Sequence, residues 1–319
     1  MLVLSDQDIA QFLTMEEAIK AVEGAFSELW RKKVNMPTRS TIMFPEFNGS
    51  ISFMPSYLGE SRAEAMKIIS IYPDNPKRGL RTTAAWVVVN DPETGAVEAF
   101  MDGTYLTAVR TGAVTGVAAK YLAPVDAHVA AVFGAGMQAK TQLWAAATVR
   151  KIEKARVYDP IKSAAVNYAS EMSEKLGISV EVATNGEEAC RGADIVITAT
   201  TSKIPVLKRD WLGEVAHVSA IGAFYPDWRE LDTATVSESK VVIDEWEAIK
   251  FEAGDILIPI KEGAITEKHV YAELGELVTG EKPGRLQEDK LTVFKSVGVA
   301  IQDASVANLV LSKVKCSIG

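Results

Sequence analysis

The chain has 319 residues, of which 48% are hydrophobic and 24% are charged, and its formal net charge is −8. This length exceeds one ordinary hydrophobic core, so about two domains are expected. The acidic balance and the lack of a basic run in the sequence argue against nucleic acid as a partner, because phosphates need clustered lysines and arginines. No stretch reaches about 18 uninterrupted apolar residues, so the sequence predicts a cytoplasmic chain without a membrane span.

Cysteine and histidine are too few and too scattered to predict a metal centre. Cys190 and Cys316 form no CxxC pair, and His128, His217 and His269 show no close spacing. Zinc sites and disulfide frameworks both need such spacing. The sequence therefore predicts no metal.

The N-terminal third of the chain predicts a mixed α+β domain. Residues Ser5–Trp30 follow a helical pattern, within which Thr14–Glu17 is typical of a capping box at a helix start. Short strands broken by prolines and glycines follow, at Ser40–Phe44, Ile51–Met54, Met66–Tyr72 and Thr83–Val89. A turn at residues 90–95 leads to a further strand at residues 96–101, so we expect an antiparallel sheet.

Two basic residues of this region stand in apolar surroundings. Lys67 lies among strand-forming neighbours, where a lysine most often protects the edge of a sheet from pairing with another chain. Arg110 is the only charge between Gly103 and Ala119, a helical stretch of small and apolar residues. A guanidinium buried there needs an anionic partner, which is either a distant carboxylate of the chain or a ligand carboxylate or phosphate.

The centre of the chain carries the pattern of a dinucleotide site. An apolar run precedes the glycine-rich turn of residues 134–139, a helical stretch follows, and a second apolar run ends on Asp159. Gly134 would make the sharp turn, Gly136 would let the backbone approach a pyrophosphate, and Ala139 would keep the helix close to the sheet. Asp159 would accept hydrogen bonds from the adenine ribose and repel a 2′-phosphate, which favours NAD over NADP. The alternative is a structural turn without a ligand.

Strands and helices continue to alternate after this unit. Further strands are expected at Val180–Ala183, Asp194–Thr200, Val215–Gly222, Lys240–Asp244 and from Leu291, and helices at Pro160–Leu176, Gly186–Gly192 and Val299–Val314. Such alternation predicts a doubly wound parallel sheet, and ligands bind beyond the carboxyl ends of its strands. The small residues at these ends are therefore candidates to contact the nicotinamide half of a cofactor.

The expected architecture is thus an α/β protein of two domains. A Rossmann domain with a doubly wound parallel sheet is expected at residues 116–302. An N-terminal α+β domain is expected at residues 1–115, completed by the C-terminal helix at residues 303–319.

Six stretches of the sequence, read together, resemble the ornithine cyclodeaminase/mu-crystallin family over nearly the whole chain. They are Met101–Gly103, Arg110–Ala113, Gly134–Ala139, Pro226–Asp232, Ala272–Glu276 and Thr292–Ser296 with Gly298. The resemblance is strongest to the mu-crystallin branch, whose members act as ketimine reductases. Alanine dehydrogenases of an archaeal type, 1-pyrroline-2-carboxylate reductases and ornithine cyclodeaminases are also members. The resemblance implies NAD or NADP as the cofactor, and a homodimer formed through the N-terminal domain, which would also bind the substrate.

The resemblance also implies roles for single residues. Arg39 matches the family arginine that binds the substrate carboxylate, and Arg110 matches a second one that also touches cofactor phosphates. Lys67 matches the lysine beside the substrate carboxylate and imine, where it would donate a proton. The expected cofactor site comprises Arg110, Thr111, Gly134, Ala135, Gly136, Met137, Gln138, Asp159, Thr200, Thr201, Ile221, Gly222, Ser296 and Gly298.

One residue departs from the family pattern. Members with cyclodeaminase or alanine dehydrogenase activity carry an aspartate shortly after the strand that ends at Ala223, where it handles the substrate amine. This chain has Phe224 there, and an apolar ring favours a less charged cyclic or alkyl imine. Asp227 is a nearby carboxylate that we expect to stabilise its loop, and Lys162 leaves NADP open as the cofactor.

We therefore expect an NAD(P)H-dependent reductase of small cyclic or alkyl ketimines that carry an α-carboxylate. Arg39, Arg110 and Phe224 would surround the substrate, and Lys67 would donate the proton. An alanine-type dehydrogenase activity is compatible with this prediction. The alternatives are ornithine cyclodeaminase, which is a lyase, and a non-catalytic NAD(P)H-binding protein.

Overall fold

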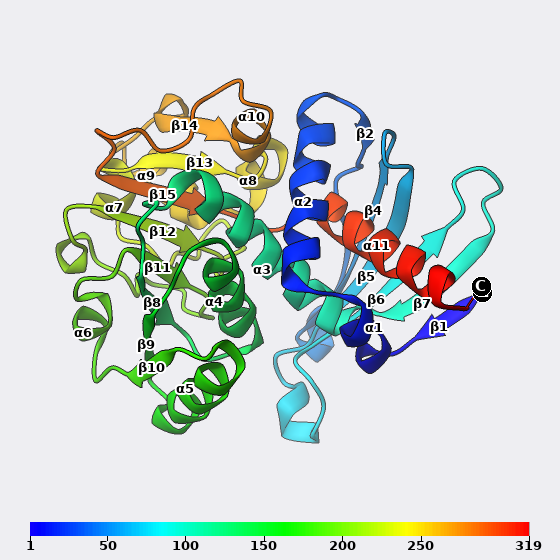
Figure 1. Cartoon of the computed structure of the whole chain (residues 1–319), viewed down its shortest axis with the longest axis horizontal. Helices are drawn as coiled ribbons and strands as arrows, with labels where there is room; N and C mark the ends of the chain where they lie inside the picture. The colour runs from blue at the N-terminus through cyan, green and yellow to red at the C-terminus, as the bar shows by residue number, and fades with distance from the viewer. Residues whose placement is uncertain (319) are drawn as a thin grey trace. The chain divides into compact units, whose positions relative to one another are not determined.

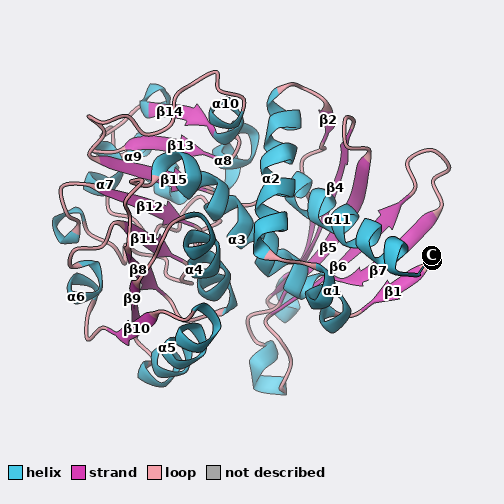
Figure 2. Ribbon diagram, in the orientation of Figure 1, coloured by secondary structure: helices cyan, strands magenta, loops and turns pink. Residues whose placement is uncertain are grey.

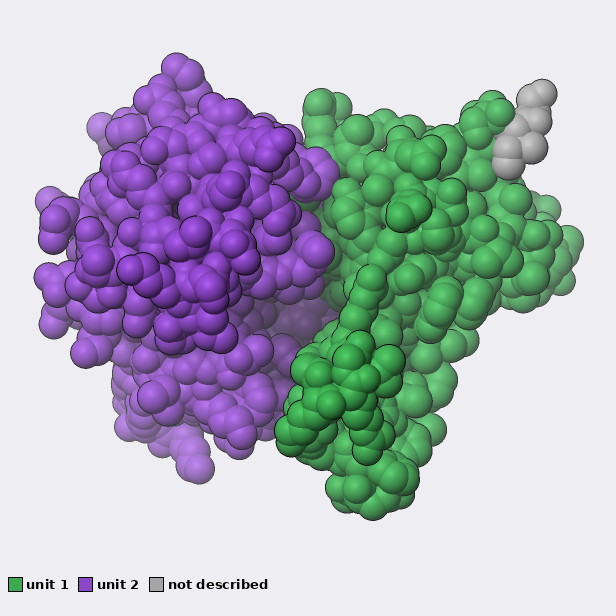
Figure 3. Space-filling view, turned by 90° about the horizontal axis from the view of Figure 1, so that it is seen from below, with its two compact units in different colours: residues 1–111, 299–319 green, residues 112–298 purple. Residues whose placement is uncertain are grey.

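The chain forms two compact units in a computed structural model that describes residues 1–318 (Figure 3). The first unit combines residues 1–111 with the chain from Val299 onward, and the second comprises residues 112–298. The limit between Thr111 and Gly112 falls inside a single helix.

The described part of the first unit contains a seven-stranded sheet. Its elements are β1 (Leu2–Leu4), α1 (Asp6–Phe12), α2 (Met15–Trp30), β2 (Val34–Asn35), β3 (Ser40–Phe44), the 3-10 helix η1 (Pro45–Phe47), β4 (Gly49–Leu58), β5 (Ala63–Ile71), η2 (Asn75–Arg78), β6 (Thr83–Asn90), β7 (Val97–Asp102), the first part of α3 (Gly103–Leu122), and α11 (Ala300–Ile318). The strand order is β1-β7-β6-β5-β4-β2, with β3 also beside β4. Every pair is antiparallel except β1 with β7, which are parallel.

The N-terminal helical pattern corresponds to two helices rather than one. The backbone is extended at Leu13 and Thr14, and Thr14 caps the second helix by accepting a hydrogen bond from the Glu17 amide. The predicted helix start at Thr14 is therefore confirmed, and the helical pattern of residues 5–30 divides into α1 and α2. The expectation of a purely antiparallel sheet is wrong, because β1 is too short to be recognised in the sequence and pairs in parallel with β7.

The two faces of this sheet differ. Helices α2 and α11 lie over one face (Figure 1), and α11 packs directly on β4, β5 and β6. Because side chains alternate along a strand, Lys67 and Val87 point to this covered face and are fully buried. Ile68 and Trp86 point to the other face, where Trp86 remains 41% exposed and stacks on Phe100 with 4.8 Å between ring centroids.

The second unit is built on an eight-stranded parallel sheet, within the described residues (Figure 2). After α3, its elements are β8 (Val129–Phe133), α4 (Met137–Val149), β9 (Lys154–Tyr158), α5 (Lys162–Leu176), β10 (Ser179–Val182), α6 (Gly186–Cys190), β11 (Ile195–Thr198), η3 (Arg209–Trp211), β12 (Ala216–Ala220), α7 (Thr233–Ser237), β13 (Lys240–Ile243), α8 (Trp246–Glu252), α9 (Gly254–Lys261), η4 (Glu267–His269), β14 (Val270–Glu273), α10 (Leu274–Val278) and β15 (Leu291–Lys295). The order is β10-β9-β8-β11-β12-β15-β13-β14. The predicted doubly wound parallel sheet is confirmed, whereas the segment from α8 to α10 had not been recognised.

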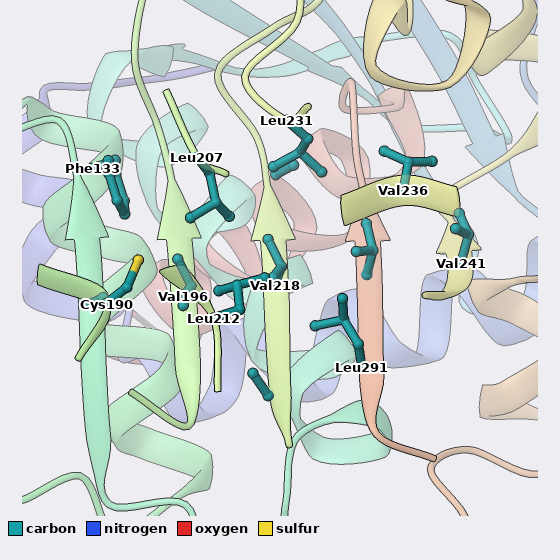
Figure 4. Packing of buried hydrophobic residues seen from close by; sticks show 14 of the residues in the cluster. Phe133, Cys190, Val196, Leu207, Leu212, Val218, Leu231, Val236, Val241 and Leu291 are labelled. Carbon is teal, nitrogen blue, oxygen red and sulfur yellow. The ribbon is translucent and has the colours of Figure 1, made fainter. Parts of the chain in front are cut away.

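The hydrophobic core of this unit occupies both faces of the sheet. Alternate residues of β8 point to opposite sides, so Phe133 joins one cluster and Val132 the other. Figure 4 shows Phe133, Val196 and Val218 on neighbouring strands, all within the first of these clusters. Each buried side chain of this size stabilises the fold by roughly 1.5–3 kcal/mol, and the two clusters fix the strand ends that carry the site.

A buried histidine in this sheet makes the stability of the fold sensitive to acid. His217 on β12 has no exposed surface, and its ring contacts the hydroxyls of Thr292 (2.9 Å) and Ser219 (3.1 Å). Burial first, and then the charges of Arg285 and Arg150, lower the pKa of His217 to about 3. At a pH between these two values, the unfolded chain, in which the histidine pKa is about 6.5, therefore binds a proton at this ring and the folded chain does not.

We expect the free energy of unfolding to be lower by roughly 2 kcal/mol at pH 5 than at pH 7 because of this histidine alone. The contribution is complete above the unfolded pKa and is lost as the pH falls from there toward the folded pKa. Urea unfolding of the wild type and of His217→Gln at both pH values measures it. The variant should lose less stability on acidification, and equal losses in the two proteins would contradict the assignment.

Candidate functional site

The glycine turn after β8 has the geometry that the sequence predicts. Gly134 has a φ of +95°, and a Cβ atom there would lie 2.6 Å from the carbonyl oxygen of Ala199. Only glycine fits such a left-handed and crowded position. The turn lies between the ends of β8 and β11, where the strand order reverses, and this is the place at which parallel α/β sheets bind ligands.

The start of α4 fits a phosphate group. Gly136 is the N-cap residue, it has no side chain to cap the helix, and a Cβ atom added to it would meet no atom within 4 Å. Gly136 therefore provides no side-chain cap to the first amides of α4, and a pyrophosphate oxygen can accept hydrogen bonds at such a helix start. Ala139 is fully buried in the core, which allows the close approach of helix and sheet that the sequence predicts.

Asp159 lies beside this turn, at the end of β9. One carboxylate oxygen accepts a hydrogen bond from the Ala135 amide (2.9 Å), and the other accepts one from the Ile161 amide (2.8 Å). A carboxylate has about four acceptor positions, so ribose hydroxyls can still bind to it. Asp159 thus has a second task that the sequence prediction did not include, which is to hold the glycine turn in place.

A buried carboxylate organises the ends of β11 and β12. Glu230 has no exposed surface, and its two oxygens accept hydrogen bonds from the Thr200 amide (2.7 Å) and the Gly222 amide (2.7 Å). It also accepts bonds from the hydroxyls of Thr200 (2.8 Å) and Thr198 (2.9 Å). Burial first, and then the charge of Asp255, raise the pKa of Glu230. Sequence reasoning placed Glu230 in a family motif but gave it no role.

A second carboxylate holds Glu230 itself. Asp255 accepts hydrogen bonds from the backbone amides of Glu230 (2.7 Å) and Leu231 (2.9 Å), and its other oxygen lies 2.8 Å from the Lys295 ammonium nitrogen. Lys295 also donates to the carbonyl oxygen of Ala223 (2.5 Å). The loop that follows Gly222 is therefore fixed at its two ends, Ala223 and Glu230, by a fully buried ion pair.

Asp244 performs the same task after β15. It accepts hydrogen bonds from the Ser296 hydroxyl (2.8 Å) and from the amides of Val297 (2.9 Å) and Gly298 (3.0 Å). The sequence prediction ended a strand at Asp244 without assigning it a function. Its position directly after a buried strand was the signal that could have found it.

Phe224 lies in an aromatic cluster in the loop after β12. Its ring centroid is 4.9 Å from that of Tyr225 and 6.3 Å from that of Trp228, and Asp227 of the same loop is exposed. Thr201, the remaining candidate of the strand ends, is also exposed. The second unit thus brings together the glycine turn, Asp159 and the strand ends.

The cationic candidates lie in the first unit. Lys67 is on β5, which has β4 on one side and β6 on the other, and it has no exposed surface. The alternative that Lys67 protects a sheet edge is therefore wrong, because β5 is an inner strand. Its ammonium nitrogen lies 2.8 Å from an oxygen of Asp303 on α11, at an angle outside that of a directed hydrogen bond.

Arg110 has the distant carboxylate that was one of the two partners considered for it. Its Nε donates to Asp303 (2.9 Å), 193 residues away in the chain, and its Nη1 donates to the Gln302 side-chain oxygen. Asp303 and Gln302 occupy the first turn of α11 and are both at least 99% buried. Sequence reasoning missed both, although an acid in the first turn of an otherwise apolar helix was a usable signal. Nearby, the Thr111 hydroxyl is bonded within α3 to the Thr107 carbonyl oxygen (2.7 Å).

The surroundings of Lys67 favour its uncharged form. Burial first, and then the positive charge of Arg110, lower the pKa of Lys67 to about 7, with Asp303 acting in the opposite direction and the half-buried Arg39 adding to the decrease. A group with a pKa near neutrality both releases and accepts protons readily. Its nitrogen has no directed hydrogen bond to any described residue and lies 2.8 Å from the Asp303 carboxylate.

Two kinds of site are not found among the described residues. No group of three or more histidine, cysteine, aspartate or glutamate side chains is arranged to hold a metal ion. No helix in residues 1–318 is both long and apolar enough to cross a membrane.

Comparison with known proteins places these features in a family. The profile of the ornithine cyclodeaminase/mu-crystallin family matches residues 1–317. The Delta(1)-pyrroline-2-carboxylate reductase of Thermococcus litoralis, whose solved structure is in complex with NADH and L-proline, is 48% identical, with a TM-score of 0.97 over 99% of this chain and 98% of that chain. An archaeal alanine dehydrogenase, solved as a dimer with bound NAD, is 37% identical, with a TM-score of 0.93 over 100% of this chain and 97% of that one.

A curated relative from Bacillus thuringiensis subsp. konkukian leads to the same group. This protein, a Delta(1)-pyrroline-2-carboxylate reductase, is 37% identical over 314 residues, which is 98% of this chain and 96% of the relative. The matched length extends over both units. The chain belongs to the ornithine cyclodeaminase/mu-crystallin family.

Proposed function

We propose that this protein is an oxidoreductase that uses NADH to reduce the C=N bond of small imino acids carrying an α-carboxylate. The substrates are of the 1-pyrroline-2-carboxylate or 1-piperideine-2-carboxylate type. The observation that carries the proposal is Lys67, a fully buried lysine with a pKa near neutrality beside the Arg110 guanidinium. Relatives that share the fold over nearly the whole chain are named as reductases of such imines.

The residues of the first unit supply the proton and the carboxylate binding. When bound, NADH supplies a hydride to the imine carbon. Lys67 donates a proton to the imine nitrogen, whose new N–H bond uses the electron pair of the C=N bond, and Lys67 becomes a neutral amine. Arg110 and Arg39 bind the α-carboxylate, since a guanidinium matches a carboxylate with two parallel hydrogen bonds. This binding fixes the orientation of the reacting carbon.

The second unit binds the dinucleotide. The fit to NAD rests on the open space at Gly136, the uncapped start of α4 and the carboxylate of Asp159. The strand ends held by Glu230 and Asp244 are proposed to contact the nicotinamide half through Thr200, Gly222 and other residues of these loops. We retain residues 116–302 as the proposed dinucleotide-binding domain, and residues 1–115 with 303–319 as the proposed substrate-binding and dimerisation domain.

Phe224 favours an uncharged ring in the substrate. The loop after β12 presents the aromatic rings of Phe224, Tyr225 and Trp228, so no carboxylate side chain occupies position 224 to hold a second amine. A cyclic imine has no such amine. Oxidative deamination of alanine, the activity named for an archaeal relative, is the second reaction to test because its imine carries the same α-carboxylate.

The test of the proposed function is the loss of NADH absorbance with defined substrates. We expect rapid oxidation with 1-pyrroline-2-carboxylate or 1-piperideine-2-carboxylate, and slower oxidation with pyruvate and ammonia. Release of ammonia from ornithine under trace NAD, without imine reduction, would replace this proposal by a cyclodeaminase. Binding of NADH without any turnover would replace it by a non-catalytic binding protein.

The choice between NADH and NADPH is expected to depend on Asp159. In Asp159→Asn the amide oxygen can still accept the Ala135 bond, but the charge that repels a 2′-phosphate is gone. We expect the ratio of kcat/KM for NADPH to that for NADH to rise about tenfold or more, equivalent to about 1.4 kcal/mol. Initial rates with both cofactors measure it, and Lys162→Ala is the companion variant, expected to lower the use of NADPH. An unchanged ratio in Asp159→Asn would show that the ribose binds elsewhere.

We also propose that the protein is a homodimer that pairs through the open face of the first unit's sheet. This face carries a continuous set of apolar side chains from five strands: Val3, Phe53, Met66, Ile68, Trp86, Val88 and Phe100. Trp86 and Val3 are 41% and 68% exposed, which is unfavourable in water for side chains of this size. A second copy of the chain would cover them.

Trp86→Asp is expected to convert the dimer into monomers, because a buried carboxylate without a partner is costly at an interface. Sedimentation velocity at micromolar concentration measures the change. The control is Val166→Asp, which places the same charge at a 48% exposed position of α5 and should leave the mass unchanged. A wild type that sediments as a monomer would contradict the proposal directly.

A further inference from the structure

We infer that Asp303 is the positioning residue of the proposed site, whose carboxylate holds the ammonium group of Lys67 and the guanidinium of Arg110 side by side. The inference rests on the proposed function, since it concerns how the proton donor and the carboxylate-binding group of that reaction are prepared. The sequence prediction gave no role to Asp303, which lies in the first turn of α11.

The geometry divides the two oxygens of this carboxylate between two cations. Oδ2 lies 2.8 Å from Lys67 Nζ, and Oδ1 accepts the hydrogen bond of Arg110 Nε at 2.9 Å. Asp303 is 1% exposed and Lys67 has no exposed surface, so water does not screen these interactions. One buried carboxylate therefore fixes the positions of both cations relative to each other.

The guanidinium is held at a second point by the preceding residue. Gln302 accepts a hydrogen bond from Arg110 Nη1, while its own amide nitrogen is buried and has no partner among the described residues. Asp303 and Gln302 thus bind the Nε and Nη1 atoms of the Arg110 guanidinium, and these two contacts fix the plane of that group. Because Gln302 is neutral, Asp303 alone supplies the compensating charge at this pair of contacts.

The charged groups of the described residues that act most strongly on Lys67 are Arg110, Arg39 and Asp303. Arg110 from α3 and Arg39 from the segment before β3 lower the pKa of Lys67, and Asp303 from α11 raises it. The residues opposite Lys67 on the neighbouring strands β4 and β6 are Met54 and Val87, which carry no charge. Removal of the charge of Asp303 would therefore leave a buried amine among cations, and the amine would lose its proton at a lower pH than in the wild type.

The experiment uses Asp303→Asn, which keeps the shape and one acceptor oxygen but removes the charge. The rate of imine reduction falls as the pH rises through the pKa of Lys67, because only the ammonium form donates a proton. In the variant we expect this fall to occur about one pH unit or more lower than in the wild type, with kcat at pH 7.5 reduced about 10- to 100-fold. Activity should recover on acidification. A variant whose pH profile coincides with that of the wild type would overturn the inference.

A measurement without turnover separates this inference from the proposed function. The ¹³Cε resonance of Lys67, assigned by its loss in Lys67→Arg, reports the pKa in the substrate-free protein. It should titrate at lower pH in Asp303→Asn than in the wild type, whether or not imines are reduced. An unchanged titration would overturn the role of Asp303, whereas a shifted titration in a protein inactive on every imine would overturn the proposed function only.

Two further variants separate the effect of the Asp303 charge from the effect of its position and from a general destabilisation of α11. Asp303→Glu keeps the charge on a longer side chain, so kcat should fall while the pH profile stays close to that of the wild type. If Asp303→Asn does not fold, Asp303→Glu still tests the inference, because a kcat equal to that of the wild type would overturn a positioning role for Asp303. Asn308→Ala removes a hydrogen bond from α11 to the Glu64 carbonyl oxygen (2.9 Å) away from the charges. It should leave the pH profile unchanged, and a shift there equal to that of Asp303→Asn would also overturn the inference.

Discussion

Replacement of Lys67 by methionine is expected to reduce kcat for imine reduction by about 10²- to 10⁴-fold, the usual contribution of a positioned proton donor. Methionine has a similar length and fits a buried position, but it has no proton to give. NADH binding should be retained, because the candidate dinucleotide residues other than Arg110 and Thr111 belong to the second unit. Steady-state kinetics, together with fluorescence titration of NADH, measure the two effects separately.

The control for this variant is a lysine that does not belong to the site. Lys77→Met removes a lysine whose side chain is 79% exposed and which pairs only with Asp74 at the surface. Surface pairs of this kind contribute about 0–1 kcal/mol, so activity and stability should stay near those of the wild type. If Lys67→Met kept more than about a tenth of the wild-type kcat, another group would have to be the proton donor.

Alanine at Gly136 is expected to weaken NADH binding by about tenfold or more without affecting the fold. The added methyl group would enter open space in the protein alone, but the same space is the proposed position of the pyrophosphate. Backbone amides at a helix start bind phosphate only when nothing separates the two groups. Isothermal titration with NADH, together with the thermal midpoint of the ligand-free protein, tests both parts of this expectation.

Gly134→Ala is the comparison variant, because we expect it to destabilise the ligand-free protein, unlike Gly136→Ala. There the methyl group would lie 2.6 Å from the Ala199 carbonyl oxygen, at a residue with a φ of +95°. We expect the thermal midpoint to fall clearly, because backbone strain and steric conflict of this kind cost on the order of 1–3 kcal/mol. If Gly136→Ala bound NADH normally, the cofactor would not cross the turn as proposed, whatever the effect at Gly134.

Local patterns were sufficient to predict the elements that carry the site. The glycine turn is encoded within six residues, because the left-handed conformation at Gly134 requires glycine and Gly136 leaves the start of α4 without a side-chain cap. The same holds for Thr14, whose helix cap is formed with Glu17 three residues later. Such contacts are short in sequence and therefore readable from it.

The remaining part of the candidate site depends on contacts between distant residues. Asp303 meets Arg110 across 193 residues and Glu230 meets Thr200 across 30, and no periodic pattern marks either pair. From its neighbours alone, Lys67 was interpreted as protecting a sheet edge, because the sequence does not show that β5 is an inner strand. Its role as a proton donor was predicted only from the family resemblance. Strand order is set by packing of the whole sheet and not by the strand itself.

Because α11 belongs to the first unit, two separate parts of the chain form that unit, and this affects how the protein folds during synthesis. During synthesis the sheet that contains Lys67 and the helix that contains Arg110 emerge long before Asp303, which enters 193 residues after Arg110. Until then the two cations have no carboxylate between them, so the nascent sheet is expected to stay loosely packed around them. The second unit is continuous in the chain and can fold first. Catalytic competence would therefore appear only after α11 has been made, and it would depend on a slow, long-range closure of the chain by this helix.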